Sequence, residues 1–413
     1  MSSLGPGRSP EPYAPSQYGY AAPTYTEVRP TAPWGTSGPP VPATPLWAAP
    51  RNRRSWSVGG AIVLVVLGII TLVSVGTIAQ TTGIDGALVG SAVALIPLVG
   101  VLLGIRWVDR WEPEPRFALL FALLWGAGVS TLVSLIINTA AAMALYANTG
   151  DVTAAETTAA VVVAPLVEET AKGLGVLVLL WTRRRYFDGP VDGIVYAATV
   201  AAGFAFVENI LYFGRSLDFL PAVFAMRGVM SPFAHVLFTA AIGVALGLAA
   251  RSRWRGAWIV AFPVGWVVAV ALHAWWNGSA STENFLPLYI VFQVPLFIGV
   301  VLLVLWLRRQ ERKVLTARLA EYGRAGWFTP GELSMLTSFS ARRQAQSWAK
   351  TLGGTAGSAM RSFQRSATRL AFARQQAASG RAGVRLAEDE RALLQRITAD
   401  RQEFLGAAAV RGR

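Results

Sequence analysis

Residues 58–79 read VGGAIVLVVLGIITLVSVGTIA, a run without a single charged side chain. A helix needs about 20 apolar residues to cross the hydrocarbon core of a bilayer. Runs of this kind recur along the chain at residues 58–79, 86–105, 117–145, 157–181, 191–213, 221–250, 256–276 and 286–307. These runs predict an all-α, polytopic membrane protein with about eight transmembrane helices.

The composition of the 413 residues agrees with this interpretation, because 53% are hydrophobic and only 15% are charged. A soluble globular chain carries nearer a quarter charged residues. The chain has no cysteine, which excludes disulfides, thiolate metal sites and a cysteine nucleophile. The two histidines are His235 and His273, so any chemistry that requires an imidazole must use one of them.

The basic residues around the runs predict the topology. They lie in alternate connections, as Arg51, Arg53 and Arg54; Arg106, Arg110 and Arg116; Arg183, Arg184 and Arg185; Arg251, Arg253 and Arg255; and Arg308, Arg309, Arg312 and Lys313. The opposite connections, 81–86, 148–156 and 278–284, contain no Lys or Arg. By the positive-inside rule both termini are cytoplasmic, and Arg215 and Arg227 are exceptions on the outer side.

The two ends of the chain differ from its middle. Residues 1–55 are rich in Pro, Gly, Ser and Tyr and predict a disordered cytoplasmic segment, with no cleavable signal peptide. Residues 56–307 form the expected transmembrane domain, and residues 308–413 form a basic, helical cytoplasmic tail, in which Thr329-Pro330-Gly331-Glu332 is a helix-start signature. The net charge of +14 could suggest nucleic acid, but its concentration in the tail and short loops favours anionic lipid.

Polar side chains inside the apolar runs are few, and such residues are functional candidates because they are costly in a bilayer. They are Glu168, Glu169 and Lys172 in run 157–181, Glu208 and Asn209 in run 191–213, His235 in run 221–250, and His273 in run 256–276, with Asn277 directly after it. At 1.5 Å per residue, Glu168 lies roughly 22 Å above Arg183 and His235 about 24 Å above Arg251. Glu208 and His273 fall at a similar depth, so we expect one site in the outer half of the membrane.

This set of side chains is suited to hydrolysis. A glutamate can act as a general base toward water, and two histidines with a glutamate can hold zinc with one open position. Lys172 lies four residues after Glu168 and can keep a glutamate ionised. Glu169 points about 100° away from Glu168, so one of the two glutamates can face the site while the other braces a neighbouring helix. Asn277 can donate to a developing oxyanion. Taken one at a time, these residues are equally typical of helix–helix hydrogen bonds.

The same residues resemble the PrsW family of bacterial intramembrane proteases, in a clan that includes the CAAX prenyl endopeptidases. The matching pieces are Glu168-Glu169-x-x-Lys172, Phe204-x-x-x-Glu208-Asn209, His235, His273 with Asn277, and Asp109-Arg110-Trp111-Glu112-Pro113-Glu114-Pro115. The resemblance covers residues 100–310 and implies a multi-pass protein of the bacterial plasma membrane. It also implies cleavage of a membrane-anchored protein, with first-site cleavage of an anti-sigma factor on the outer side as the best-known role.

Two mechanisms remain open at this stage. In the first, Glu208, His235 and His273 bind a divalent metal, most simply zinc, and Glu168 or Glu169 is the base. In the second, Glu168 and His235 activate water without metal, and His273 with Asn277 forms the oxyanion site. Two other classes of protein also fit the sequence: a proton-coupled transporter that uses Glu208 and Lys172, and a membrane scaffold without enzymatic activity whose tail binds lipid.

Overall fold

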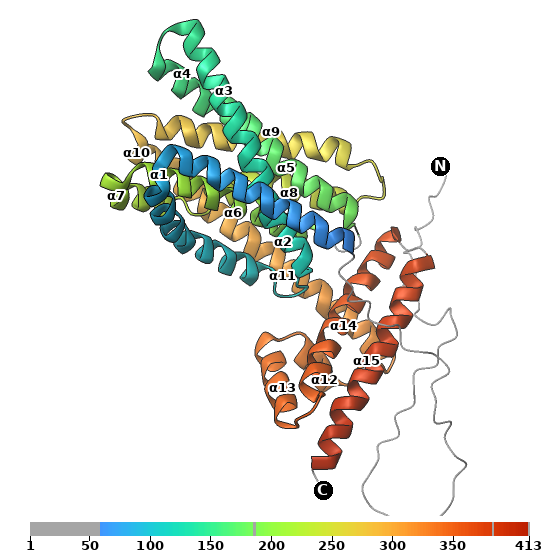
Figure 1. Ribbon diagram of the computed structural model, residues 1–413. Helices are drawn as coiled ribbons and strands as arrows, with labels where there is room; N and C mark the ends of the chain where they lie inside the picture. The colour runs from blue at the N-terminus through green and yellow to red at the C-terminus, as the bar shows by residue number, and fades with distance from the viewer. Residues whose placement is uncertain (1–57, 185–186, 382–383, 412–413) are drawn as a thin grey trace, which may run out of the picture. The chain divides into compact units, whose positions relative to one another are not determined.

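The computed structural model describes residues 58–184, 187–381 and 384–411, and within these ranges the secondary structure is helical throughout. This confirms the all-α prediction (Figure 1). The disordered segment expected at residues 1–55 lies outside the described residues, as do Arg51, Arg53, Arg54 and Arg185 of the basic clusters. The described chain divides between Arg309 and Gln310 into a membrane unit and a tail unit.

The membrane unit is built of long helices interrupted by short 3-10 and π segments. In chain order these are α1 (Val58–Val108), α2 (Arg116–Leu124), η1 (Trp125–Ser130), α3 (Thr131–Thr149), α4 (Val152–Thr158), η2 (Ala159–Val163), α5 (Ala164–Thr182), α6 (Pro190–Arg215), η3 (Leu217–Phe219), α7 (Leu220–Phe224), η4 (Ala225–Met230), α8 (Ala234–Arg251), α9 (Trp258–Ala280), α10 (Phe285–Leu288), η5 (Tyr289–Gln293) and α11 (Val294–Arg324).

Six helices in the described residues are long and apolar enough to cross a membrane, against the eight runs expected. One difference arises because α1 contains both of the first two runs. Its backbone leaves the helical region at Gly83, with φ 74° and ψ 165°, and the ribbon turns back on itself there (Figure 1). The other difference is residues 152–182, which form α4, η2 and α5 and carry three charged side chains in α5. The multi-pass architecture itself is confirmed.

Helix α6 is the centre of the membrane unit, and nearly all of its residues from Pro190 to Phe204 are buried. Its contact with α8 is made by backbone rather than by side chains. A Cβ atom placed on Gly193 would lie 1.9 Å from the carbonyl oxygen of Gly243. Small residues allow this close approach in membrane helices. The two helices that carry Glu208 and His235 are therefore packed backbone against backbone.

The connection between α1 and α2 is fastened to α6 by carboxyl groups. The Asp109 carboxylate accepts hydrogen bonds from the Glu114 backbone N–H at 3.0 and 3.1 Å, and the Tyr196 hydroxyl donates to the Glu114 side chain. Burial raises the pKa of Asp109 to about 7 and raises the pKa of Glu114 well above its usual value. The Asp109–Pro115 segment is thus a structured connection that leads into α2.

The tail unit is a small helical assembly that follows the long helix α11. It contains α12 (Pro330–Leu336), α13 (Phe339–Thr351), α14 (Ala356–Gln376), η6 (Ala377–Arg381) and α15 (Val384–Arg411). The helix start predicted at Thr329 is confirmed, because its side chain accepts from the Glu332 N–H while the Glu332 carboxylate accepts from the Thr329 N–H. Helix α14 is largely buried and forms the core of this unit.

Candidate active site

Helix α5 brings three charged side chains together inside the membrane unit. Lys172 Nζ lies 3.3 Å from Glu168 Oε2 and 2.8 Å from Glu169 Oε1, and all three residues are buried. Residues three and four apart share one face of a helix, so the spacing produces this contact directly. The ammonium group neutralises carboxylates that would otherwise be prohibitively costly to bury.

Of the two glutamates, Glu169 is the one that braces the neighbouring helices. Its Oε2 atom accepts from the Thr239 hydroxyl of α8 at 2.8 Å, and its Oε1 atom lies 3.0 Å from His273 Nδ1 of α9. Because a carboxylate only accepts, Nδ1 of His273 carries the proton and Nε2 keeps its lone pair. That Nε2 atom faces Glu168, with Oε2 at 3.8 Å. Glu169 therefore sets the orientation of the second imidazole.

His235 on α8 is held at both of its ring nitrogens. Its Nε2 atom is 2.8 Å from Glu208 Oε2, and its Nδ1 atom is 3.2 Å from Lys172 Nζ. An ammonium group only donates, so Nδ1 accepts and Nε2 donates to Glu208. The unprotonated nitrogen of His235 is consequently on the side of Lys172 and Glu168.

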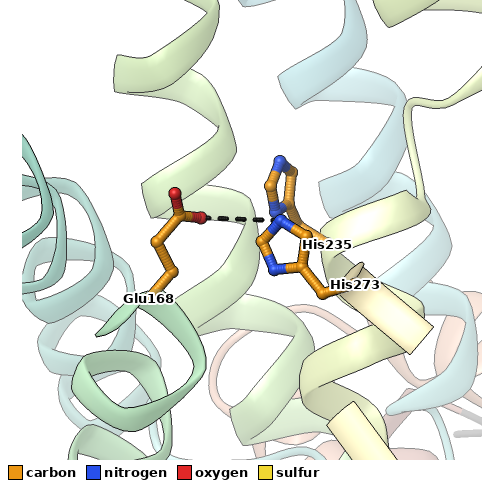
Figure 2. A group of neighbouring side chains, drawn as sticks. All are labelled: Glu168, His235 and His273. Carbon is orange, nitrogen blue, oxygen red and sulfur yellow. Dashed lines mark ion pairs between the residues drawn. The ribbon is translucent and has the colours of Figure 1, made fainter. Parts of the chain in front are cut away.

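Glu168, His235 and His273 each offer one ligand atom, and these atoms lie within 4.8 Å of one another (Figure 2). One oxygen and two imidazole nitrogens are the donor set of many catalytic zinc sites, which keep a fourth position for water. The Glu169 contact to His273 Nδ1 also matches the carboxylate that commonly orients a metal-bound histidine. The residues present therefore fit a divalent metal.

Glu208 lies beside this group of three rather than within it. Its carboxylate pairs with Arg227 of η4 and accepts from His235, while Arg227 Nε donates to Asn209 Oδ1 at 2.7 Å. The predicted ligand Glu208 thus contacts a histidine but is engaged by a guanidinium. Arg227 is not among the residues predicted from the sequence to form the site. Its expected location on the outer side, as an exception to the positive-inside rule, was a signal that it has a specific role there.

Asn277 is not brought to the imidazoles. Its amide donates to the Ala160 backbone carbonyl at 2.8 Å, so it joins α9 to η2. Another amide takes part instead: Asn138 Nδ2 of α3 donates to Glu168 Oε1 at 3.3 Å. Asn138 is an isolated amide in an apolar run and could have been noticed, whereas nothing in the sequence distinguishes Thr239 from other membrane threonines.

The site gathers five ionisable side chains that are charged in their usual states, besides the two histidines. Three are carboxylates, Glu168, Glu169 and Glu208, and two are cations, Lys172 and Arg227. The set therefore carries an excess of one negative charge when both imidazoles are neutral. Such a site can hold a cation or accept a proton from water, which are the two requirements of the hydrolytic mechanisms considered above.

Comparisons with known proteins identify relatives of the membrane unit. Residues 114–309 match the model of a family described as "PrsW family intramembrane metalloprotease". "Protease PrsW" of Clostridioides difficile (strain 630) is 31% identical over 153 residues, which are 36% of this chain and 62% of that protein. "Protease PrsW" of Geobacillus kaustophilus (strain HTA426) is 32% identical over 164 residues, which are 40% of this chain and 67% of that protein. No solved structure matches.

Proposed function

Because the chain belongs to the PrsW family of intramembrane metalloproteases, we propose that it hydrolyses a peptide bond in a membrane-anchored protein. The observation that carries this proposal is the convergence of Glu168, His235 and His273, from three helices, at one buried point of the membrane unit. A buried carboxylate beside two imidazoles can take a proton from a water molecule and so activate it as a nucleophile.

Each side chain of the site has a proposed task. In the mechanism without a metal, Glu168 takes the proton of the attacking water, because it faces both imidazoles and lacks the hydroxyl and imidazole donors that occupy Glu169. Glu169 orients His273, and Lys172 pairs with both carboxylates. Glu208 orients His235 through its Nε2 proton. Asn277 is proposed as an accessory donor that would have to leave its present partner.

A divalent metal, most simply zinc, is the proposed cofactor. Glu168, His235 and His273 would hold it, and the bound metal would supply a polarised water near neutral pH. Elemental analysis of the purified protein, together with cleavage before and after 1,10-phenanthroline, tests this assignment. Activity that is lost with chelator and restored by zinc supports the metal. Full activity in metal-free protein would assign catalysis to the glutamate and histidines alone.

The activity is tested with Glu168→Gln, which keeps the size of the side chain and removes the base. Loss of a general base costs about 10²- to 10⁴-fold in rate, so we expect cleavage of a reconstituted substrate to fall by this order. Alanine at Glu169, His235 or His273 should have a comparable effect. The matched control is Glu283→Gln, an exposed glutamate outside the site. Full activity in all four site variants would rule out the assignment.

We further propose an anti-sigma factor as the substrate, cut first on the outer side of the bacterial plasma membrane, with both chain termini cytoplasmic. The support is the family resemblance and the alternation of arginine-rich connections. Incubating candidate membrane-anchored regulators with the wild type and with Glu168→Gln would identify the substrate. Sequencing of the fragments would place the cut on the inner or outer side.

We propose anionic lipid as the partner of the tail. Arg361, Arg365 and Arg369 are exposed on α14 and, at a spacing of four residues, lie on one helical face. Flotation of the full-length protein and of a tail-deleted form in nanodiscs, with phosphatidylglycerol or phosphatidylcholine vesicles, tests this. Binding that requires both the tail and the anionic lipid is the expected result.

A further inference from the structure

Residues 217–230, which form η3, α7 and η4, follow directly on α6, the helix that carries Glu208. We call them the outer segment. None of these described residues is buried, and Phe219 and Val229 are 72% and 66% exposed. A segment with so few buried contacts belongs to the least stable part of a fold and opens most readily.

The helix of the outer segment is also discontinuous. It changes from a 3-10 turn to a short α-helix that begins near Pro221, and then to the π segment η4. It ends at Ser231, where φ is −131°, just before Pro232. Proline and π segments interrupt the regular backbone ladder, and π segments occur often at functional sites.

A single charged side chain ties this segment to the site. Arg227 pairs with Glu208, donates to Asn209 at 2.7 Å and lies 3.9 Å from the ring centre of Tyr212. All three partners are on α6. The other attachments are apolar or involve the backbone. Leu220, Val223 and Phe224 pack against the core cluster that contains Phe213, with 6.0 Å between the Phe224 and Phe213 centroids, and the Tyr289 hydroxyl donates to the Met230 carbonyl at 2.8 Å.

The Arg227 contact reaches the reacting groups through one atom. Oε2 of Glu208 accepts from Arg227 and, at 2.8 Å, from His235 Nε2. The guanidinium fork holds this carboxylate and the Asn209 amide at the same time, which a lysine ammonium on a flexible stem cannot reproduce. The contact between Arg227 and Glu208 therefore has two effects: it holds the outer segment against α6, and it orients His235.

We propose that the outer segment is a gate beside the active site and that Arg227 is its latch. With the latch closed, Arg227 acts as a positioning residue that fixes Glu208 and, through it, His235. Release of Arg227 lets the segment move away from α6 and opens the buried cluster to substrate and water. This inference rests on the proposed proteolytic function for its purpose, but the motion can be measured without any cleavage.

The absence of native cysteine makes thiol labelling a direct measurement of opening. Phe213→Cys places one thiol at a fully buried position beneath Phe224 of the segment. We would compare its rate of reaction with a water-soluble maleimide in nanodiscs for wild-type Arg227, Arg227→Met and Arg227→Lys. The matched control is Arg215→Met, which removes an exposed arginine from the end of α6.

We expect Arg227→Met to increase the labelling rate about tenfold, the order expected when a charge-assisted contact is lost. Arg227→Lys should give an intermediate rate, and Arg215→Met should leave the rate unchanged. A second reporter, Ala269→Cys at a buried position of α9, should label slowly in every background. Equal rates with and without Arg227, or a parallel rise at Ala269→Cys, would overturn the gate.

Cleavage assays separate the latch from the proposed function. We expect Arg227→Met to lower kcat more than it raises KM, because His235 loses its orientation while the route to the site opens. Partial recovery of kcat in Arg227→Lys is expected. If labelling responds as described but the wild type cleaves no membrane-anchored substrate, the gate stands and the proposed function fails.

Discussion

Lys172 of the membrane unit and Arg342 of the tail unit are both buried, but their charges are satisfied in different ways. In the tail, Arg342 donates to the Leu336 carbonyl and the Thr368 hydroxyl, both at 2.8 Å. In the membrane unit, Lys172 contacts two carboxylates and an imidazole. The partners of Arg342 are backbone and hydroxyl groups that do not titrate. The partners of Lys172 are groups that can exchange protons. A buried charged side chain alone therefore does not indicate a functional site, whereas contact with other titratable groups does.

The strongest test of this contrast is Lys172→Met. Removing one partner of a buried ion pair costs about 3–5 kcal/mol, because the remaining charge has no compensation. We expect cleavage to be abolished and thermal unfolding in detergent to shift strongly downward. Thr182→Val, an exposed change at the end of the same helix, serves as the control. Wild-type stability and activity in Lys172→Met would show that the two carboxylates do not depend on this ammonium.

The second test addresses the backbone contact between α6 and α8. Gly193→Ala would place a Cβ atom 1.9 Å from the Gly243 carbonyl oxygen, so the two helices must separate. Overpacking of this kind costs about 1–3 kcal/mol, and we expect reduced stability together with a lower kcat. Gly299→Ala on α11 is the matched control, since nothing lies within 4 Å of the added atom. Equal behaviour of the two variants would contradict a rigid α6–α8 contact.

The third test is the tail counterpart of the first. Arg342→Met leaves the Leu336 carbonyl without its donor, and loss of hydrogen bonds from a charged group costs about 1.5–3 kcal/mol. We expect easier proteolysis of the tail helices, measured by limited trypsin digestion, with unchanged substrate cleavage. Arg343→Met, which changes the exposed neighbouring residue, should alter neither. A loss of cleavage in Arg342→Met would mean that the tail contributes to catalysis.

The smallest effect is expected at the Asp109–Pro115 connection. The pKa of Asp109 is raised to about 7 from 3.8, so between these values the folded protein binds a proton that the unfolded chain has released. This carboxyl group therefore makes the free energy of unfolding fall as pH rises through that window. Asp109→Asn keeps an acceptor for Glu114 and lacks the titration, so its Tm relative to wild type should rise from pH 4 to pH 8. Asp85→Asn, at an exposed position, should show no such trend.

Much of the site was predictable because bilayer thickness fixes where a helix begins and ends. Counting residues from the basic connections placed Glu168, Glu208, His235 and His273 at one depth, and all four lie in contact with another member of the set. Depth does not fix how each helix is rotated or where it bends. For this reason the sequence did not distinguish Glu168 from Glu208 as the partner of both imidazoles, nor did it reveal that Asn277 faces Ala160.

The bends depend on single residues and on contacts between distant elements. The backbone before Arg227 runs as separate short helices. The length of the apolar run 221–250 indicated an irregular outer end but did not locate the break. The pairing of the first two runs within α1 was likewise hidden, because only the conformation of Gly83 separates them. Periodicity and composition describe continuous helices well and their interruptions poorly.

The turn at Gly83 also has a consequence for biosynthesis. With φ at 74°, this position suits glycine, and a residue with a side chain would be disfavoured there by about 1–2 kcal/mol. Because the backbone leaves the helical region only at this glycine, the two runs form a helical hairpin, and we expect them to enter the bilayer together. The hairpin is complete before Glu114, where the family match begins, has been synthesised. We therefore expect the helices that carry the candidate site to be inserted beside a hairpin that is already in the membrane.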